Sequence, residues 1–261
     1  MKFFNMRALN KKKLALFAIF LVLINYLSLT SYPIRDTFNK MSLQSPWVEN
    51  IMCSNSTASY IYTLYVFIFS GFIYADSLVL DKESGLLNII ASKIDYNTYI
   101  VKTLVYNFFI AGVFAVIPAI VNLCLWFTVR TNVPLVYFNI MNMHPDALFL
   151  GVFLKSHLAF YILHFIKIFL CGGIIATFAI FINTSLNNKY IGMVVTFIMD
   201  ILLSLILVRV MPNVEVSFFI FVSSLMKPDI LTLIIFLVFL LPSIIYFALR
   251  IKERDILWLN L

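Results

Sequence analysis

Apolar stretches long enough to cross a lipid bilayer as helices recur along the whole chain. About 20 apolar residues in a helix span the roughly 30 Å hydrocarbon core of a bilayer. Helices suit that medium because every backbone N–H and C=O group finds its partner within the segment. The sequence therefore predicts a single-domain, all-α integral membrane protein over residues 1–261. Six transmembrane helices are expected, at about 14–30, 58–80, 103–127, 158–183, 190–210 and 230–249.

The composition excludes an ordinary soluble domain. Hydrophobic residues make up 62% of the chain, charged residues only 12%, and the mean hydropathy is +0.99. A soluble domain has about half apolar and about a quarter charged residues. The net charge of +7 does not indicate nucleic-acid binding, because the basic residues adjoin apolar segments instead of covering one soluble face. Lipid, and not nucleic acid, is the expected surrounding.

The first apolar segment has a signal peptide as its alternative, since Lys11, Lys12 and Lys13 precede it. Its apolar run continues to about Thr30, which is longer than the core of a usual signal peptide, and no A-x-A cleavage motif follows. We expect a retained first span.

The distribution of basic residues predicts that both ends of the chain lie on the inner side. Lysine and arginine concentrate in the inner loops of membrane proteins. With both ends inside, 12 basic residues lie on the inner side and 5 on the outer side. The inner residues are Lys2, Arg7, Lys11, Lys12, Lys13, Lys82, Lys93, Lys102, Lys189, Arg250, Lys252 and Arg254. The outer residues are Arg35, Lys40, Arg130, Lys155 and Lys227.

Small residues and prolines within the spans indicate a packed bundle. Ala111, Ala115 and Ala119 repeat every four residues, as do Gly172 and Ala176, and such spacing lets helix backbones approach closely. Pro118 and Pro242 lie inside predicted spans and are expected to kink them. The outer segment 211–229 is too short to cross and too apolar for a free loop. It predicts a short outer-surface helix or a re-entrant hairpin, with a buried loop as the alternative.

A search for catalytic motifs indicates a non-catalytic chain. No glycine is followed by lysine, so the phosphate-binding loop of many ATPases is absent, and neither H-E-x-x-H nor G-x-S-x-G occurs. Asp76 and Asp200 lack the glycine-flanked context of an aspartyl protease. His157 and His164 share a helical face with Lys167, whose charge opposes a metal. We predict no catalytic residue and no metal site.

Lys167 and Asp200 lie well inside the fourth and fifth predicted spans. Charges within a membrane cost at least a few kcal/mol each, so they usually face other helices and often pair. An intramembrane ion pair between them is one expectation. The alternative is that Lys167 extends its side chain toward water.

The segment between the second and third predicted spans has the strongest functional signal. It contains a short amphipathic helix, opened by charged residues and Gly85, in which Leu86, Ile89, Ile90 and Lys93 share one face and Leu87 neighbours it. On physical grounds alone it is an interfacial helix at the inner surface.

This segment resembles the ABC-2 type transporter permeases, in which an acidic residue, a glycine, a short leucine-rich helix and a lysine connect spans two and three. The residues that match this order are Glu83, Gly85, Leu86, Leu87, Ile89, Ile90 and Lys102. Six spans, a basic N-terminal segment, a short outer element between spans five and six and a basic tail also resemble that family. The chain departs from it at Ile94-Asp95-Tyr96, where a proline often follows the short helix.

The resemblance implies the permease subunit of a bacterial ABC transporter in the cytoplasmic membrane. Separate ATPase subunits, which carry ATP and Mg²⁺, are expected to dock on the inner loops, and a second permease, identical or homologous, to complete the pathway. The implied substrates are hydrophobic: peptides such as bacteriocins, lipids or drugs. Two alternatives remain at this point. One is a secondary transporter half or membrane scaffold with Lys167 and Asp200 in ion coupling. The other is a polytopic membrane enzyme.

Overall fold

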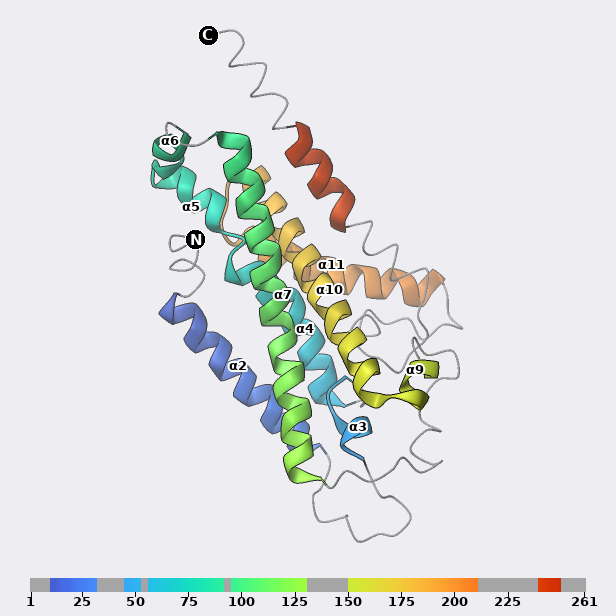
Figure 1. Ribbon diagram of the computed structural model, residues 1–261. Coiled ribbons are helices and arrows are strands. Elements are labelled where there is room, and N and C mark those ends of the chain that lie inside the picture. The colour runs from blue at the N-terminus through green and yellow to red at the C-terminus, as the bar shows by residue number, and fades with distance from the viewer. Residues whose placement is uncertain are drawn as a thin grey trace.

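The computed structural model describes residues 10–31, 45–52, 56–91, 95–130, 150–210 and 239–249, and within these ranges every regular element is a helix. Figure 1 shows the longer helices side by side in a bundle. The helices are α2 (Lys11–Thr30), α3 (Pro46–Glu49), α4 (Thr57–Ile73), α5 (Ser77–Glu83), α6 (Leu86–Ala91), α7 (Tyr96–Val129), α9 (Leu150–Lys155), α10 (His157–Leu186), α11 (Ile191–Val210) and a last helix, Phe239–Leu249.

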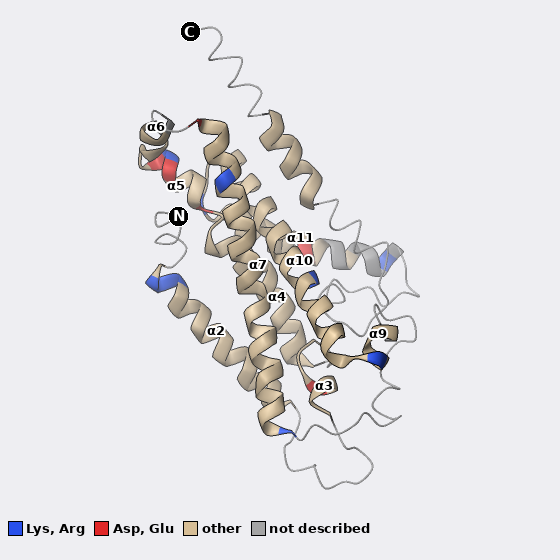
Figure 2. Cartoon of the chain, in the orientation of Figure 1, with Lys and Arg blue, Asp and Glu red and all other residues tan. Residues whose placement is uncertain are grey.

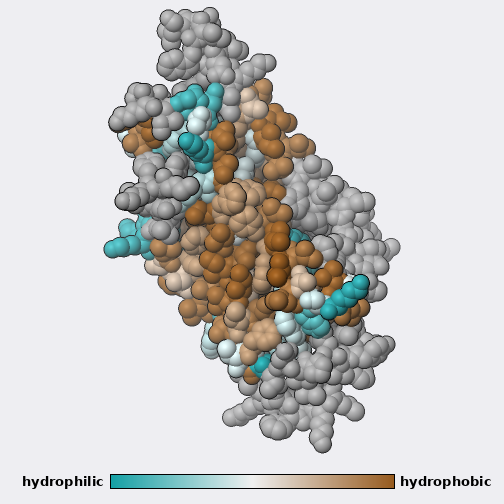
Figure 3. Space-filling model, in the orientation of Figure 1, coloured by the Kyte–Doolittle hydropathy of each residue, from teal (hydrophilic) through white to brown (hydrophobic). Residues whose placement is uncertain are grey.

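Four helical segments are long and apolar enough to cross a membrane. They are Lys11–Thr30, Thr57–Glu83, Tyr96–Val129 and His157–Leu186, and they coincide with the first four predicted spans. Figure 3 shows hydrophobic residues over the middle of the visible face and hydrophilic residues toward its ends. The helix α7 has 34 residues. At 1.5 Å per residue it is about 51 Å long and extends well beyond a hydrocarbon core of roughly 30 Å.

The fifth and sixth predicted spans are described only in part. The apolar portions found there are shorter helices, Ile191–Leu202 and Phe239–Leu249, so six crossings stay a prediction. Figure 1 shows α11 running across the other helices instead of along them. A Cβ on Gly192 would lie 2.3 Å from the carbonyl oxygen of Ala179, so only glycine permits α11 to cross so close to α10. The outer element predicted at 211–229 lies outside the described residues.

The central pair of helices, α7 and α10, is held together by small residues. A Cβ on Gly172 would lie 2.7 Å from the Cβ of Ala115 and 3.2 Å from the carbonyl oxygen of Ala111. Ala119 and Ala176 on the same two helices are fully buried. The predicted close packing of small residues is therefore confirmed, and it brings the two backbones within direct van der Waals contact.

Tyrosines of α4 satisfy the backbone of α7 around Pro118. Proline has no N–H, so it leaves the carbonyl four residues earlier, that of Phe114, without its helical partner. The hydroxyl of Tyr65 donates to this oxygen at 3.0 Å, and that of Tyr62 donates to the carbonyl oxygen of Ala115 at 2.8 Å. A neighbouring helix thus supplies the hydrogen bond that an apolar surrounding would not supply.

The second predicted span is not one continuous helix, and its prediction over 58–80 is wrong in this respect. The helix α4 ends at Ile73, Tyr74 follows with φ −140° and ψ −5°, and α5 begins only at Ser77. A break of this kind frees backbone carbonyls, which must find other donors in an apolar surrounding. Side chains from α2 and α10 supply them, as described below.

The charged side chains of the described residues gather toward the two ends of the bundle, with few between (Figure 2). We call one of them the α6 end. It contains the start of α2, the break between α4 and α5, the helices α5 and α6, the start of α7 and the turn between α10 and α11. The opposite end, which we call the α3 end, contains α3, the end of α7, α9 and the start of α10.

Candidate functional site

Gly85 separates α5 from α6 in the predicted functional segment. Its φ is +70°, in the left-handed region that glycine adopts without strain. The N–H of Gly85 donates to the carbonyl of Lys82 at 3.2 Å, which closes the last turn of α5. A Cβ at this position would meet nothing within 4 Å, so the requirement for glycine comes from the backbone angle and not from crowding.

The short helix predicted after Gly85 is present as α6, Leu86–Ala91. Leu86, Leu87 and Ile90 are half-buried, and Ile90 packs against a cluster formed by α5, α7, α10 and the last helix. Ile89 is 56% exposed. The apolar surface of α6 is therefore divided: one part holds the helix on the bundle, and another part faces outward.

Polar contacts fix α5 to the turn between α10 and α11. The Nζ of Lys189 lies 3.4 Å from the carboxylate of Glu83, and the Nζ of Lys82 donates to the side-chain oxygen of Asn187 at 2.9 Å. Asn187 is in the left-handed region, with φ 50°, and ends α10. Both contacts are exposed, so each stabilises the position of α5 only modestly. They nevertheless give the segment before α6 a defined attachment.

The other face of α5 is fixed to α7. The buried carboxylate of Asp81 accepts a hydrogen bond from the hydroxyl of Tyr99, one turn after the start of α7. Lys102, a further predicted site residue, lies on the exposed side of α7 and projects away from this contact. Asp95 caps the start of α7 by accepting from the backbone and hydroxyl of Thr98. These hydrogen bonds lower the pKa of the Asp95 carboxyl below its ordinary value.

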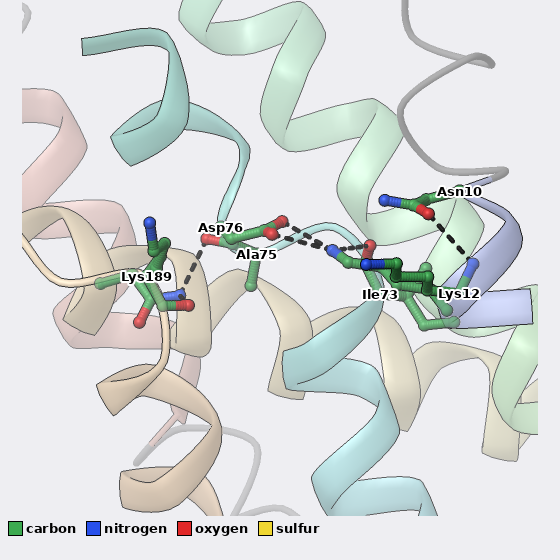
Figure 4. Close-up of polar contacts among 8 residues, drawn as sticks. Asn10, Lys12, Ile73, Ala75, Asp76 and Lys189 are labelled. Atoms are coloured by element: carbon green, nitrogen blue, oxygen red, sulfur yellow. Dashed lines mark hydrogen bonds and ion pairs between the residues drawn. The ribbon is translucent and has the colours of Figure 1, made fainter. Parts of the chain in front are cut away.

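The break between α4 and α5 is held from two sides (Figure 4). The Nζ of Lys13, in the first turn of α2, donates to the carbonyl of Ile73 at 2.9 Å and to both carboxylate oxygens of Asp76, at 3.0 and 2.9 Å. From α10, the side-chain amide of Asn183 donates to the carbonyl of Ala75 at 2.9 Å. The side chains of Lys13 and Asp76 are only 14% and 16% exposed, so solvent screens this ion pair far less than a surface pair.

Asn183 also positions the start of α11. Its side-chain oxygen accepts from the backbone N–H of Gly192 at 2.6 Å, and its amide lies 3.3 Å from the carbonyl oxygen of Lys189. One fully buried side chain thus connects α10, the α4–α5 break and the turn into α11. The arrangement forms a continuous mechanical path from α6 through α5 and the break to α4.

The predicted pair of Lys167 and Asp200 is not among the ion pairs that join described residues. Both side chains are largely inside the bundle. The helices α10 and α11 touch where Asn183 meets Gly192, and Lys167 precedes Asn183 by sixteen residues, which is about 24 Å along a helix. Because α11 runs across α10, its residues diverge from the part of α10 that carries Lys167.

The two histidines noted in the sequence lie apart from the α6 end. His157 packs on the rings of Trp47 and Phe153, and His164 is fully buried against the ring of Phe160. Cys171 is buried in the core, as the sequence suggested, whereas Cys124 is exposed. Over the part of the chain that the structure describes, no three His, Cys, Asp or Glu residues are grouped so that they could hold a metal ion.

A second polar cluster, at the α3 end, was missed by the sequence analysis. Arg130 pairs with Glu49 at 3.0 Å, and the two side chains are only 3% and 4% exposed. Burial raises the pKa of the Glu49 carboxyl, and the neighbouring Arg130 opposes that rise. Asn50 donates to the hydroxyl of Tyr161. The sequence signal was weak, because Glu49 lies 81 residues before its partner.

The comparisons with known proteins place no family on this chain: no family model, no curated protein and no solved structure matches it.

Proposed function

We propose that this chain is the permease subunit of an ATP-driven ABC transporter of the ABC-2 type, with six spans and both ends in the cytoplasm. One observation carries the proposal. A short helix, α6, follows a left-handed glycine at one end of a bundle of long apolar helices, and presents part of its apolar surface outward. Such a helix suits insertion into a cleft of a soluble partner, here the ATPase subunit.

The charge distribution supports this orientation. Among the described residues the α6 end carries Lys11, Lys12, Lys13, Lys82, Lys102 and Lys189, whereas the α3 end carries Arg130 and Lys155. The excess of basic residues favours the cytoplasmic side for the α6 end. An ATPase must dock on that side.

The path from α6 to α4 supports a coupling role. Movement of α6 is transmitted to α5 across Gly85, and α5 continues into the break that Lys13 and Asn183 hold. In this proposal ATP and Mg²⁺ bind the partner subunit, and a second permease, identical or homologous, completes the pathway. The exported or expelled substrate is hydrophobic: a peptide such as a bacteriocin, a lipid or a drug.

The test removes the apolar surface of α6. In the double variant Leu86→Ala with Ile90→Ala, the lost contact is worth up to roughly 2–3 kcal/mol for each fully buried side chain. We expect normal insertion but loss of ATPase co-purification and of ATPase stimulation. Gly85→Val should act similarly, because valine resists the positive φ at this position.

The matched control is Leu16→Ala with Ile19→Ala, an exposed apolar pair on α2, and it should retain the ATPase. Full association and transport in both α6 variants would show that this helix is only interfacial, and the proposed function would lose its main support.

A further inference from the structure

A groove with purely apolar walls lies between α7 and α10. Its volume is about 360 Å³. The lining side chains include Val113, Ile117 and Ile120 from α7 and Ile162, Ile166 and Phe169 from α10. The groove is open to the surroundings, because Val113 is 46% exposed and Ile166 is 52% exposed. It lies on helices whose middle portions belong to the hydrophobic surface in Figure 3.

One cation lies on the same face of α7 as the groove. With 3.6 residues per turn, positions i, i+3, i+7 and i+11 fall on one side of a helix. Lys102, Val105, Phe109 and Val113 have this spacing. All four are exposed, Val105 and Phe109 by 50% and 55%, so an uninterrupted apolar strip connects the lysine with the groove.

The distance between lysine and groove matches one leaflet of a bilayer. Eleven residues separate Lys102 from Val113, which is about 16 Å along a helix. Half of a hydrocarbon core of roughly 30 Å is about 15 Å. When Lys102 lies at the level of the phosphate groups of one leaflet, the groove lies near the middle of the bilayer, where acyl chains of that leaflet end.

We propose that this face of α7 and α10 is a binding site for one anionic phospholipid. Its phosphate pairs with Lys102, its acyl chain follows the exposed strip past Val105 and Phe109, and the end of the chain fills the groove. The cation selects an anionic headgroup by charge complementarity, and the apolar walls select the chain. Asp95, seven residues before Lys102, does not compete for the lysine, since Thr98 engages its carboxylate.

This inference does not rest on the proposed transport function. It requires only that the long apolar helices lie in a bilayer. A free phosphate ion would not use the groove, and a second copy of the chain would cover the strip without any need for a phosphate at Lys102. These differences separate the three occupants experimentally.

The test measures which lipid stays bound. The full chain is purified in detergent with equal amounts of phosphatidylglycerol and phosphatidylcholine, and the retained lipid is identified by native mass spectrometry. We expect one retained phospholipid and a preference of about fivefold for phosphatidylglycerol, the effect of one lysine on an anionic headgroup. Lys102→Ala should reduce the preference to parity, and Val113→Trp should abolish retention of both lipids. Ile166→Trp fills the groove from the opposite wall and repeats that test should the first variant fold poorly.

The matched controls are Lys155→Ala, an exposed lysine at the α3 end, and Val22→Trp, an exposed position on α2. Both should retain the wild-type preference. The proposal is overturned if Lys102→Ala keeps the preference or if both groove variants retain the lipid. It is equally overturned if the wild-type chain appears as a lipid-free dimer that the groove variants dissociate, which would assign the groove to a second copy.

Discussion

Single side chains complete the backbone of neighbouring helices at several points in this bundle. The Tyr65 hydroxyl replaces the hydrogen bond that Pro118 removes from the carbonyl of Phe114. The proline itself was evident in the sequence, and a kink was the expected consequence. Which partner would satisfy the freed carbonyl was not evident, because Tyr65 precedes Phe114 by 49 residues and no local pattern connects them.

Tyr65→Phe tests this contact with the loss of one oxygen atom. The freed carbonyl of Phe114 is then buried without a donor, which costs about 1–3 kcal/mol. We expect a lower midpoint of thermal unfolding in detergent. Tyr26→Phe, at an exposed position on α2, is the control and should leave the midpoint unchanged. Equal midpoints for the two variants would contradict the role assigned to Tyr65.

The buried pair of Arg130 and Glu49 gives a prediction that depends on pH. Arg130→Met leaves the Glu49 carboxylate buried without its cation, which costs about 3–5 kcal/mol at neutral pH. Because Arg130 opposes the rise in the pKa of Glu49, its removal raises that pKa further. A raised folded-state pKa means that stability is present below it and is lost as the pH rises through it.

The Arg130→Met variant should therefore recover stability on mild acidification, as measured by thermal unfolding across a pH series. The double variant with Glu49→Gln, which carries no charge at either position, should lack that recovery. If Arg130→Met is equally unstable at acid and neutral pH, protonation of Glu49 is not the cause.

At the scale of elements, the helix break at residues 74–76 is the feature that hydropathy could not predict. Its residues, Tyr74, Ala75 and Asp76, include neither proline nor glycine, so no local signal ends the helix there. The long apolar helices, by contrast, follow from composition alone, because no other structure satisfies the backbone in lipid. Gly85 was recognised in advance because a glycine between a charged turn and an apolar run marks a helix end. The break depends on Lys13 and Asn183, which come from distant elements.

Three consecutive lysines at the start of α2 allow a sharp test of that break. Only Lys13 of the three contacts Asp76 and the carbonyl of Ile73 among the described residues, while Lys12 is exposed. Lys13→Met should lower the stability of the folded chain by about 1–3 kcal/mol, because it leaves polar groups of the break without a donor. Lys12→Met removes the same charge from the same helix and should change little.

Both variants can be compared by folded yield and by thermal unfolding. Asp76→Asn added to Lys13→Met should restore part of the loss, since it removes the carboxylate that was left unpaired. Strictly additive losses would show that Lys13 and Asp76 act independently.

At the scale of the whole molecule, topology is the prediction that most needs a direct measurement. The three native cysteines are first replaced, and single cysteines are then introduced at Lys40, Lys93, Lys189 and Lys227. With six crossings and both ends inside, an impermeant thiol reagent added to intact cells should label positions 40 and 227. Positions 93 and 189 should label only after the membrane is opened. Labelling of position 93 from outside would overturn the orientation.

The tyrosine contacts of α4 with α7 also set conditions on how the chain is made. A ribosome delivers α4 to the membrane before α7, so the hydroxyls of Tyr62 and Tyr65 are in place when the carbonyls around Pro118 enter. Lys13 likewise arrives long before Asp76 and the carbonyl of Ile73. At both places the donor is synthesised first and the acceptor later. Biosynthesis therefore spares α7 and the α4–α5 break a period in lipid with their acceptors unsatisfied, and a permuted chain with α7 ahead of α4 would not have that protection.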